Sequence, residues 1–80
     1  MATEVRSLLD VRGVAPKDRL ATILGAYDAL ATGQILELTV DHDPKCMYYT
    51  LRAMHGEESF SFCYLEEGPE VWCVEVGKRA

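Results

Sequence analysis

The spacing of the apolar residues alternates along the chain between the period of a strand and that of a helix. This succession of strand-like and helix-like segments limits the folds that the chain can adopt. A short apolar run at residues 7–12 precedes Gly13, which is typical of a strand that enters a turn. Pro16 suits the first position of a helix, where its missing N–H costs nothing. The spacing of one helical face then predicts a helix that ends near Thr32, with Gly33 as its stop. Its apolar residues are Leu20, Ile23, Leu24, Tyr27 and Leu30.

A second strand and a second helix follow. Residues 34–41 alternate between polar and apolar side chains, the latter being Leu36, Leu38 and Val40. This is the period of a half-buried strand. We interpret Asp43 and Pro44 as the N-cap and first residue of a helix that ends at Gly56. The predicted apolar stripe of this helix consists of Met47, Tyr48, Leu51 and Met54.

The last third of the chain has the character of a β-hairpin. Two strand-like runs, at residues 58–65 and 71–76, flank a turn sequence at residues 66–69. We expect a register in which Cys63 lies opposite Cys73 on one side of the hairpin. The other side is then uniformly apolar, with the facing pairs Phe62–Val74, Tyr64–Trp72 and Phe60–Val76.

The element order β-α-β-α-β-β predicts an α+β fold, a two-layer sandwich with both helices on one face of a four-stranded sheet. Right-handed crossovers make the first two strands parallel and bring both helix N-termini to the same edge of the sheet. We expect residues 1–80 to form a single domain with a small core.

The charge and the cysteines exclude several classes of protein. The chain has thirteen acidic and eight basic residues, a formal net charge of -5, which disfavours binding to nucleic acid. We find no signal peptide and no apolar stretch long enough for a membrane. Three cysteines at these spacings match neither a disulfide framework nor a zinc knuckle, so we expect reduced thiols. We therefore expect a cytoplasmic, monomeric protein without a cofactor.

Polar residues gather at the predicted strand ends. Asp10 and Arg12 close the first strand, and Asp41, His42 and Asp43 follow the second. Ligands of open α/β sheets bind outside the carboxyl ends of strands, where helix N-termini present free N–H groups. The alternative interpretation is structural: Asp43 only caps its helix, and Asp10 and Arg12 only form a surface ion pair.

Two residues in this region carry reactive side chains. The carboxylates beside His42 favour a protonated ring, suited to acid/base work or, together with Cys46, to metal binding. Cys46 is the best candidate nucleophile, because a position in the first helical turn favours the thiolate. The alternatives are a histidine bonded to a loop carbonyl and a cysteine that only fills space. The common motifs of nucleotide-binding enzymes and hydrolases are absent.

Four motifs taken together resemble the bacterial domain-of-unknown-function family 2249. They are Leu9–Gly13 (LDVRG), Ala26–Gln34 (AYDALATGQ), Asp41–Lys45 (DHDPK) and Tyr64–Trp72 (YLEEGPEVW). This family is similar to the TusA/SirA sulfur carriers, which implies strand order 1-2-4-3 with the last strand antiparallel to the rest. The sulfur carriers bear a Cys-Pro pair whose cysteine becomes a persulfide. This chain has Ala15-Pro16 instead, which excludes a persulfide relay at position 15.

The implied strand order also brings the tip of the hairpin, with Glu66, to the edge formed by the other motifs. We therefore expect a non-enzymatic binding or accessory module, linked to redox or sulfur physiology. Its binding residues for a partner protein or small ligand are Arg12, Asp41, His42, Asp43 and Glu66. Two alternatives stay open: a thiol-dependent sulfur or redox transferase that uses Cys46, and a metal-binding protein that uses His42.

Overall fold

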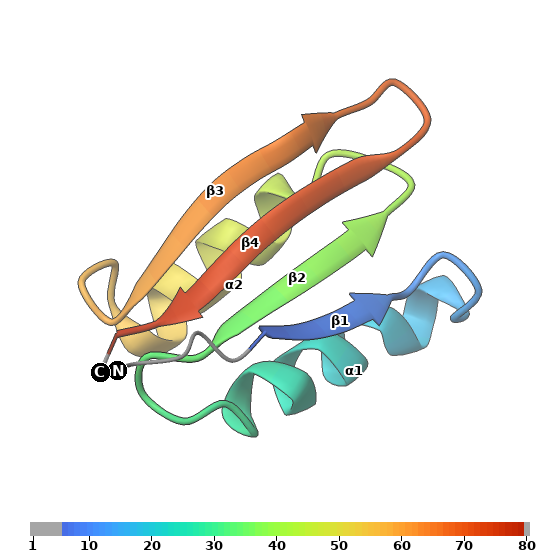
Figure 1. The fold of residues 1–80 in the computed structure, drawn as a ribbon. Helices are drawn as coiled ribbons and strands as arrows, with labels where there is room; N and C mark the ends of the chain where they lie inside the picture. Colours follow the sequence, from blue (N-terminus) through green and yellow to red (C-terminus); the bar gives the residue numbers. More distant parts are fainter. Residues whose placement is uncertain (1–5, 80) are drawn as a thin grey trace.

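The computed structural model describes residues 6–79, and its elements follow the expected order (Figure 1). They are β1 (Arg6–Asp10), α1 (Pro16–Asp28), β2 (Ile35–Val40), α2 (Lys45–His55), β3 (Phe60–Glu67) and β4 (Trp72–Lys78). The strands form one sheet in the order β1-β2-β4-β3. β1 and β2 are parallel, and β4 is antiparallel to both β2 and β3. The α+β fold and the implied strand order are thus confirmed.

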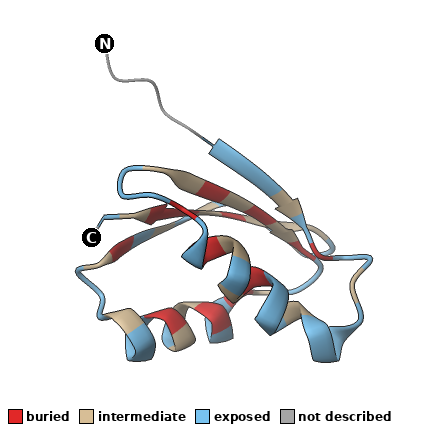
Figure 2. Ribbon diagram, turned by 90° about the horizontal axis from the view of Figure 1, so that it is seen from below, coloured by how far each residue is buried: buried red, intermediate tan, exposed pale blue. Residues whose placement is uncertain are grey.

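Both helices lie on the same side of the sheet, and the core fills the space between the two layers (Figure 2). The alternation along β2 explains this arrangement, because Leu36, Leu38 and Val40 are at most 3% exposed and face the helices. Within residues 6–79, no helix is long and apolar enough to cross a membrane.

The first helix is shorter than predicted. α1 ends at Asp28, not near Thr32, although the alanines that follow favour a helix. The chain turns early because Leu30 enters the core, where it is 6% exposed. Gly33 lies beyond the helix with φ +91°, and its N–H donates to the carbonyl of Lys78 at 2.7 Å. This turn therefore joins the start of β2 to the end of β4.

The predicted N-cap of the second helix is wrong. Pro44 occupies the cap position, without a side-chain hydrogen bond, and Lys45 is the first helical residue. The Pro44 carbonyl accepts hydrogen bonds from the N–H groups of Met47 (3.0 Å) and Tyr48 (3.3 Å). The side chain of Asp43 turns away from the helix toward β3.

Two predicted core residues are exposed, Leu20 at 46% and Met54 at 56%. The residues of each helix that lie deepest against the sheet form a row spaced four apart, and Leu24, Ala26 and Tyr48 pack beside these rows. In α1 that row runs through Arg19, Ile23 and Tyr27, and in α2 through Met47, Leu51 and His55. A polar residue thus occupies one end of each row, and the apolar neighbours Leu20 and Met54 lie off it.

The hairpin register differs from the predicted one by two residues, because Phe62 lies opposite Val76 and not opposite Val74. Two features set the register. The turn at residues 68–71 is closed by a hydrogen bond of 2.8 Å from the N–H of its first residue to the carbonyl of its last. A bulge at Leu65 then takes one residue of β3 out of the pairing.

Before the bulge, a shift of two residues leaves every side chain of the hairpin on its expected side of the sheet. Beyond the bulge the shift is three residues, which brings Glu66 to the side of Cys73. The apolar side of the hairpin is confirmed: Phe60 is 2% exposed, and Phe62, Tyr64 and Trp72 pack against the core. The predicted facing pair of cysteines is wrong. Cys63 lies opposite Glu75, and Cys73 lies opposite Glu66.

Candidate functional site

The candidate site lies at the end of the sheet where β1 and β2 finish and where α1 and α2 begin. Neither helix has a side-chain cap, because Ala15 and Pro44 occupy the cap positions. β3 runs parallel to β1 and β2, so the β3–β4 hairpin reaches the same end.

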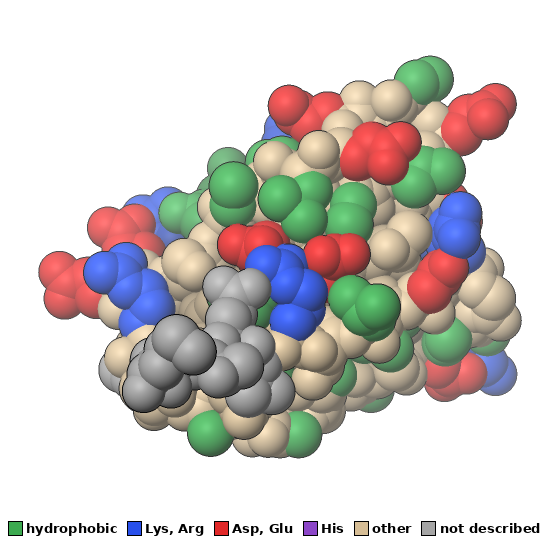
Figure 3. Space-filling view, viewed as in Figure 1, with side chains coloured by type: hydrophobic (Ala, Val, Ile, Leu, Met, Phe, Trp, Pro, Cys, Tyr) green, Lys and Arg blue, Asp and Glu red, His purple; other side chains and the backbone are tan. Residues whose placement is uncertain are grey.

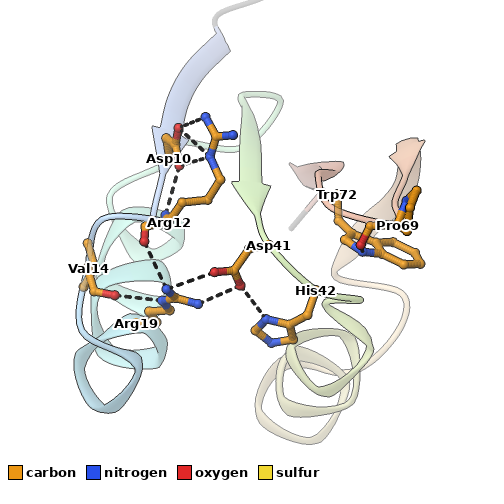
Figure 4. Close-up of polar contacts among 8 residues, drawn as sticks. All are labelled: Asp10, Arg12, Val14, Arg19, Asp41, His42, Pro69 and Trp72. Carbon is orange, nitrogen blue, oxygen red and sulfur yellow. Dashed lines mark hydrogen bonds and ion pairs between the residues drawn. The ribbon is translucent and has the colours of Figure 1, made fainter.

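Arg19 holds the two loops of this end together (Figure 4). Its Nε donates to the carbonyl of Val14 at 2.8 Å, and one terminal nitrogen donates to the carbonyl of Arg12 at 3.1 Å. Its guanidinium also binds both carboxylate oxygens of Asp41, at 2.9 and 3.3 Å. The Arg19 side chain is only 14% exposed.

Arg19 was absent from the predicted site, although the sequence carries a signal for it. A cation in the first turns of a helix is unfavourable beside the positive end of the helix dipole. An arginine four positions into a predicted helix, at the start of the row that faces the sheet, therefore needs a partner that stabilises it. The carboxylate of Asp41 is that partner.

Asp41 also orients His42. The Nδ1 atom of His42 lies 2.9 Å from Oδ1 of Asp41, and the ring is 69% exposed. The hydrogen bonds from His42 and then from Arg19 lower the pKa of Asp41. Of the two neighbouring carboxylates, only Asp41 contacts the ring. Within residues 6–79, Nε2 of His42 has no hydrogen-bond partner, and it lies on the outward side of the ring, away from Asp41 (Figure 4).

Asp43 connects the loop to the sheet. Its Oδ1 accepts a hydrogen bond of 2.7 Å from the hydroxyl of Tyr64 on β3. This bond, followed by burial, raises the pKa of Tyr64 to about 12. Asp43 therefore has a structural role, different from the predicted cap, and nothing in the sequence indicates this contact with a residue twenty-one positions away.

Arg12 forms an ion pair with Asp10, as expected from the alternative interpretation in which these residues have only a structural role. Its side chain makes three hydrogen bonds to the two carboxylate oxygens of Asp10, at 2.6 to 3.0 Å. This contact lowers the pKa of Asp10 to about 2. The same contact raises the pKa of Arg12, with smaller contributions from Asp41 and Glu66. Both side chains of the pair are nearly half exposed.

Glu66 lies beside a tightly held turn. The indole N–H of Trp72 donates to the carbonyl of Pro69 at 3.3 Å (Figure 4). Gly68 has φ +50°, and a Cβ there would come within 2.6 Å of the Trp72 ring, so the turn requires glycine. Within residues 6–79, Glu66 makes no hydrogen bond or ion pair with the other predicted site residues.

A half-open cavity of about 290 Å³ lies between the N-terminal halves of the two helices. We name it the helix groove. Its lining is largely apolar. Leu20 is part of this lining, and its side chain is exposed because the groove is open to solvent. The lining residues are Pro16, Arg19, Leu20, Ile23, Val40, His42, Asp43, Pro44, Cys46, Met47 and Thr50. Sequence reasoning missed the groove, because its residues come from two segments, 16–23 and 40–50, that only the fold brings together.

The three cysteines occupy different surroundings. Cys46 is exposed in the first turn of α2 and lines the helix groove together with His42. Cys63 is exposed on the sheet, while burial raises the pKa of Cys73. Across residues 6–79, no three His, Cys, Asp or Glu side chains are grouped so that they could hold a metal ion.

The chain was compared with known proteins. A family model described as "Uncharacterized conserved protein (DUF2249)" matches residues 8–78, from within β1 to the last residue of β4. Neither the curated proteins nor the solved structures gave a match. Because the matched segment covers nearly the whole fold, the chain belongs to the DUF2249 family of uncharacterised conserved proteins.

Proposed function

We propose that this protein is a binding module whose binding site is the helix groove, with His42 at its rim. The groove itself is the main support: a largely apolar, half-open cavity of about 290 Å³ beside the strand ends. Small-molecule pockets begin at roughly 300 Å³. The groove therefore suits a small amphipathic ligand, or one large apolar side chain of a partner protein.

The polar residues around the groove support this function indirectly. Asp41 holds Arg19 and His42, and Asp43 holds Tyr64, so these carboxylates already have partners within the fold. They keep the loops in place and leave the outward nitrogen of His42 to meet a polar group of the ligand. Arg12 and Glu66 do not line the groove, and we assign them to the outer edge of the binding surface.

The resemblance of the sequence motifs to the sulfur carriers supports a wider role for the module. Similarity to the sulfur carriers favours a non-enzymatic accessory role in redox or sulfur physiology, in the cytoplasm. Ala15 occupies the position of the carrier cysteine and has no side-chain hydrogen bond to the helix. Ligand binding in the neighbouring groove is the function that this end of the fold retains.

Two-dimensional NMR with small apolar fragments, such as indole and hexanol, tests the groove. We expect the amide signals of Ile23, Met47 and Thr50 to shift on titration. Leu20→Asp places a charge in the groove and should abolish these shifts. Met54→Asp is the matched control, because Met54 is similarly exposed but does not line the groove. Shifts that are absent from the groove, or that persist in Leu20→Asp, would contradict the proposal.

The position of Cys46 favours a second candidate function, a thiol-dependent sulfur transferase. Cys46 is exposed, lies in the first turn of α2 and shares the groove with His42, which Asp41 orients. In this function the Cys46 thiolate attacks the outer sulfur of a persulfide donor. An S–S bond forms to Cys46, the S–S bond of the donor breaks, and the donor leaves as a thiolate.

Mass spectrometry after treatment with glutathione persulfide distinguishes the two candidates. A transferase should gain one sulfur atom at Cys46 faster than at Cys63, which is also exposed but lies outside the groove. His42→Gln should reduce that preference. Equal labelling of both thiols rules out the transferase and leaves the binding function intact.

A further inference from the structure

The face of the sheet that points away from the helices is a second surface of unusual composition (Figure 3). We name it the open sheet face. Strand alternation and the register place Leu8 of β1, Glu37 of β2, Glu75 of β4 and Cys63 of β3 side by side across it. Figure 3 shows apolar and acidic side chains intermixed on this face.

Apolar side chains on this face are well exposed. Leu8 is 74% exposed, and Leu65, at the bulge of β3, is 50% exposed. Cys63 is exposed beside Leu65 on β3, and Cys73 is half-buried on the neighbouring strand β4. These three side chains bring apolar surface together on two adjacent strands, and contiguous exposed apolar surface marks a site of interaction.

Carboxylates outnumber cations among the described residues of this face. Glu37 and Glu75 share the guanidinium of Arg6, at 2.9 and 2.6 Å. Glu66, one row further along, makes no ion pair within residues 6–79. The arrangement around Arg6 shows that a guanidinium fits between carboxylates of neighbouring strands, and Glu66 offers a similar carboxylate to a cation from elsewhere.

We propose that the open sheet face docks an amphipathic helix of a partner protein, apolar along its centre and flanked by Lys or Arg. Strands lie about 4.8 Å apart, so the four strands span roughly 14 Å, and a helix is about 10 Å across. One helix is therefore wide enough to cover most of the apolar side chains of this face. The opposite face is likewise covered by helices, α1 and α2. Its basic flank would lie near Glu66 at the edge strand β3.

The charge of the chain argues against a second copy as the occupant. Two such chains, each with a formal charge of -5, would place carboxylates against carboxylates. Like charges in contact cost several kcal/mol in an interface. The same negative charge attracts a cationic partner. Because salt screens this attraction, the affinity of the partner should fall as the salt concentration rises.

The exposed cysteines provide an internal readout. We would titrate a synthetic Leu- and Lys-rich amphipathic helical peptide and measure the alkylation of each cysteine by iodoacetamide with mass spectrometry. Bound peptide should slow the alkylation of Cys63 and leave that of Cys46, on the helical layer, unchanged. A peptide in which serine replaces leucine is the control for charge alone, and it should protect neither thiol.

Charge variants give the second measurement. Glu66→Lys should weaken peptide binding about fivefold, the largest effect expected for one exposed ion pair. Glu58→Lys carries the same charge change before β3, outside the face, and should have a smaller effect. Absent protection of Cys63, equal protection of Cys46, or equal effects of the two variants would overturn the proposal. Protection of Cys63 at high protein concentration without peptide would identify a second copy as the occupant and also overturn it.

Discussion

The two faces of the sheet are built from neighbouring residues and have opposite properties. Leu38 is fully buried under the helices, while Thr39, the next residue, lies on the open sheet face. On the covered face, polar side chains occur at the rim, where Arg19 and His42 meet the loops. On the open face, Arg6, three carboxylates and two thiols lie on the sheet itself. The covered face supplies stability, and its rim and the open face supply surfaces for binding.

Truncation of one leucine on each face should give the largest difference. Leu38→Ala should lower the free energy of unfolding by about 2–5 kcal/mol, because it leaves a cavity in the core. Leu8→Ala should change the free energy of unfolding by less than about 0.5 kcal/mol, because Leu8 is 74% exposed. Urea denaturation measures both. Similar losses in the two variants would show that the open face is also part of the core.

Substitution of Arg19 on α1 and of Arg6 on β1 should give a smaller difference, with the larger loss of stability again on the covered side of the sheet. Arg19→Met should cost about 1–3 kcal/mol, because two backbone carbonyls and Asp41 lose a largely buried, charged donor. Arg6→Met should cost less than about 1 kcal/mol, because the Arg6 side chain is more exposed, at 31% against 14% for Arg19. Denaturation at low and high salt checks this, and the Arg6 effect alone should shrink with salt. Equal losses would contradict the distinction between the rim and the open face.

The hydrogen bond between Tyr64 and Asp43 joins the covered side of β3 to the loop before α2, and a substitution of Tyr64 tests it. Tyr64→Phe should cost about 1 kcal/mol at neutral pH, through loss of the bond to Asp43. The pKa of Tyr64 is about 12 in the folded protein, above the ordinary value near 10, so folding favours the neutral phenol. Its contribution is complete below pH 10 and is lost as the pH rises from about 10 to about 12.

Denaturation between pH 8 and pH 12 measures this dependence, and Tyr64→Phe should reduce it. Part of the dependence should persist, because burial also raises the pKa of Tyr27. Tyr49→Phe is the matched control, since Tyr49 is 54% exposed and should change the alkaline profile less than Tyr64→Phe does. An unchanged profile in Tyr64→Phe would show that the contact with Asp43 is not formed in solution.

The smallest expected effect is a difference in reaction rate between two thiols, and its measurement involves no change in stability. Cys73 should react with iodoacetamide more slowly than Cys63 at neutral pH, because burial raises its pKa and restricts access. Timed alkylation followed by peptide mapping measures the two rates. A Cys73 that reacts as fast as Cys63 would indicate that the end of the open face near Glu66 opens readily.

Reading apolar residues from the sequence located the core and missed the residues that shape the site. Arg19 lies in the row of α1 that faces the sheet but carries a polar side chain, so apolar periodicity alone does not identify it. Leu20 fits the apolar spacing and instead lines the groove. Asp43 has the local signature of a cap, and a phenol from a distant strand outcompetes the helix for its carboxylate. A local pattern cannot show which distant partner a side chain will meet.

Local periodicity by itself determined the order of the elements, the buried side of β2 and the apolar side of the hairpin, because each follows from neighbours one to four positions apart. The family resemblance supplied the strand order. Tertiary structure alone decided the hairpin register, the helix groove and the partners of Arg19 and Asp43. Each of these depends on contacts between segments far apart in the chain, and their competing hydrogen bonds and packing are settled only when both layers are in place.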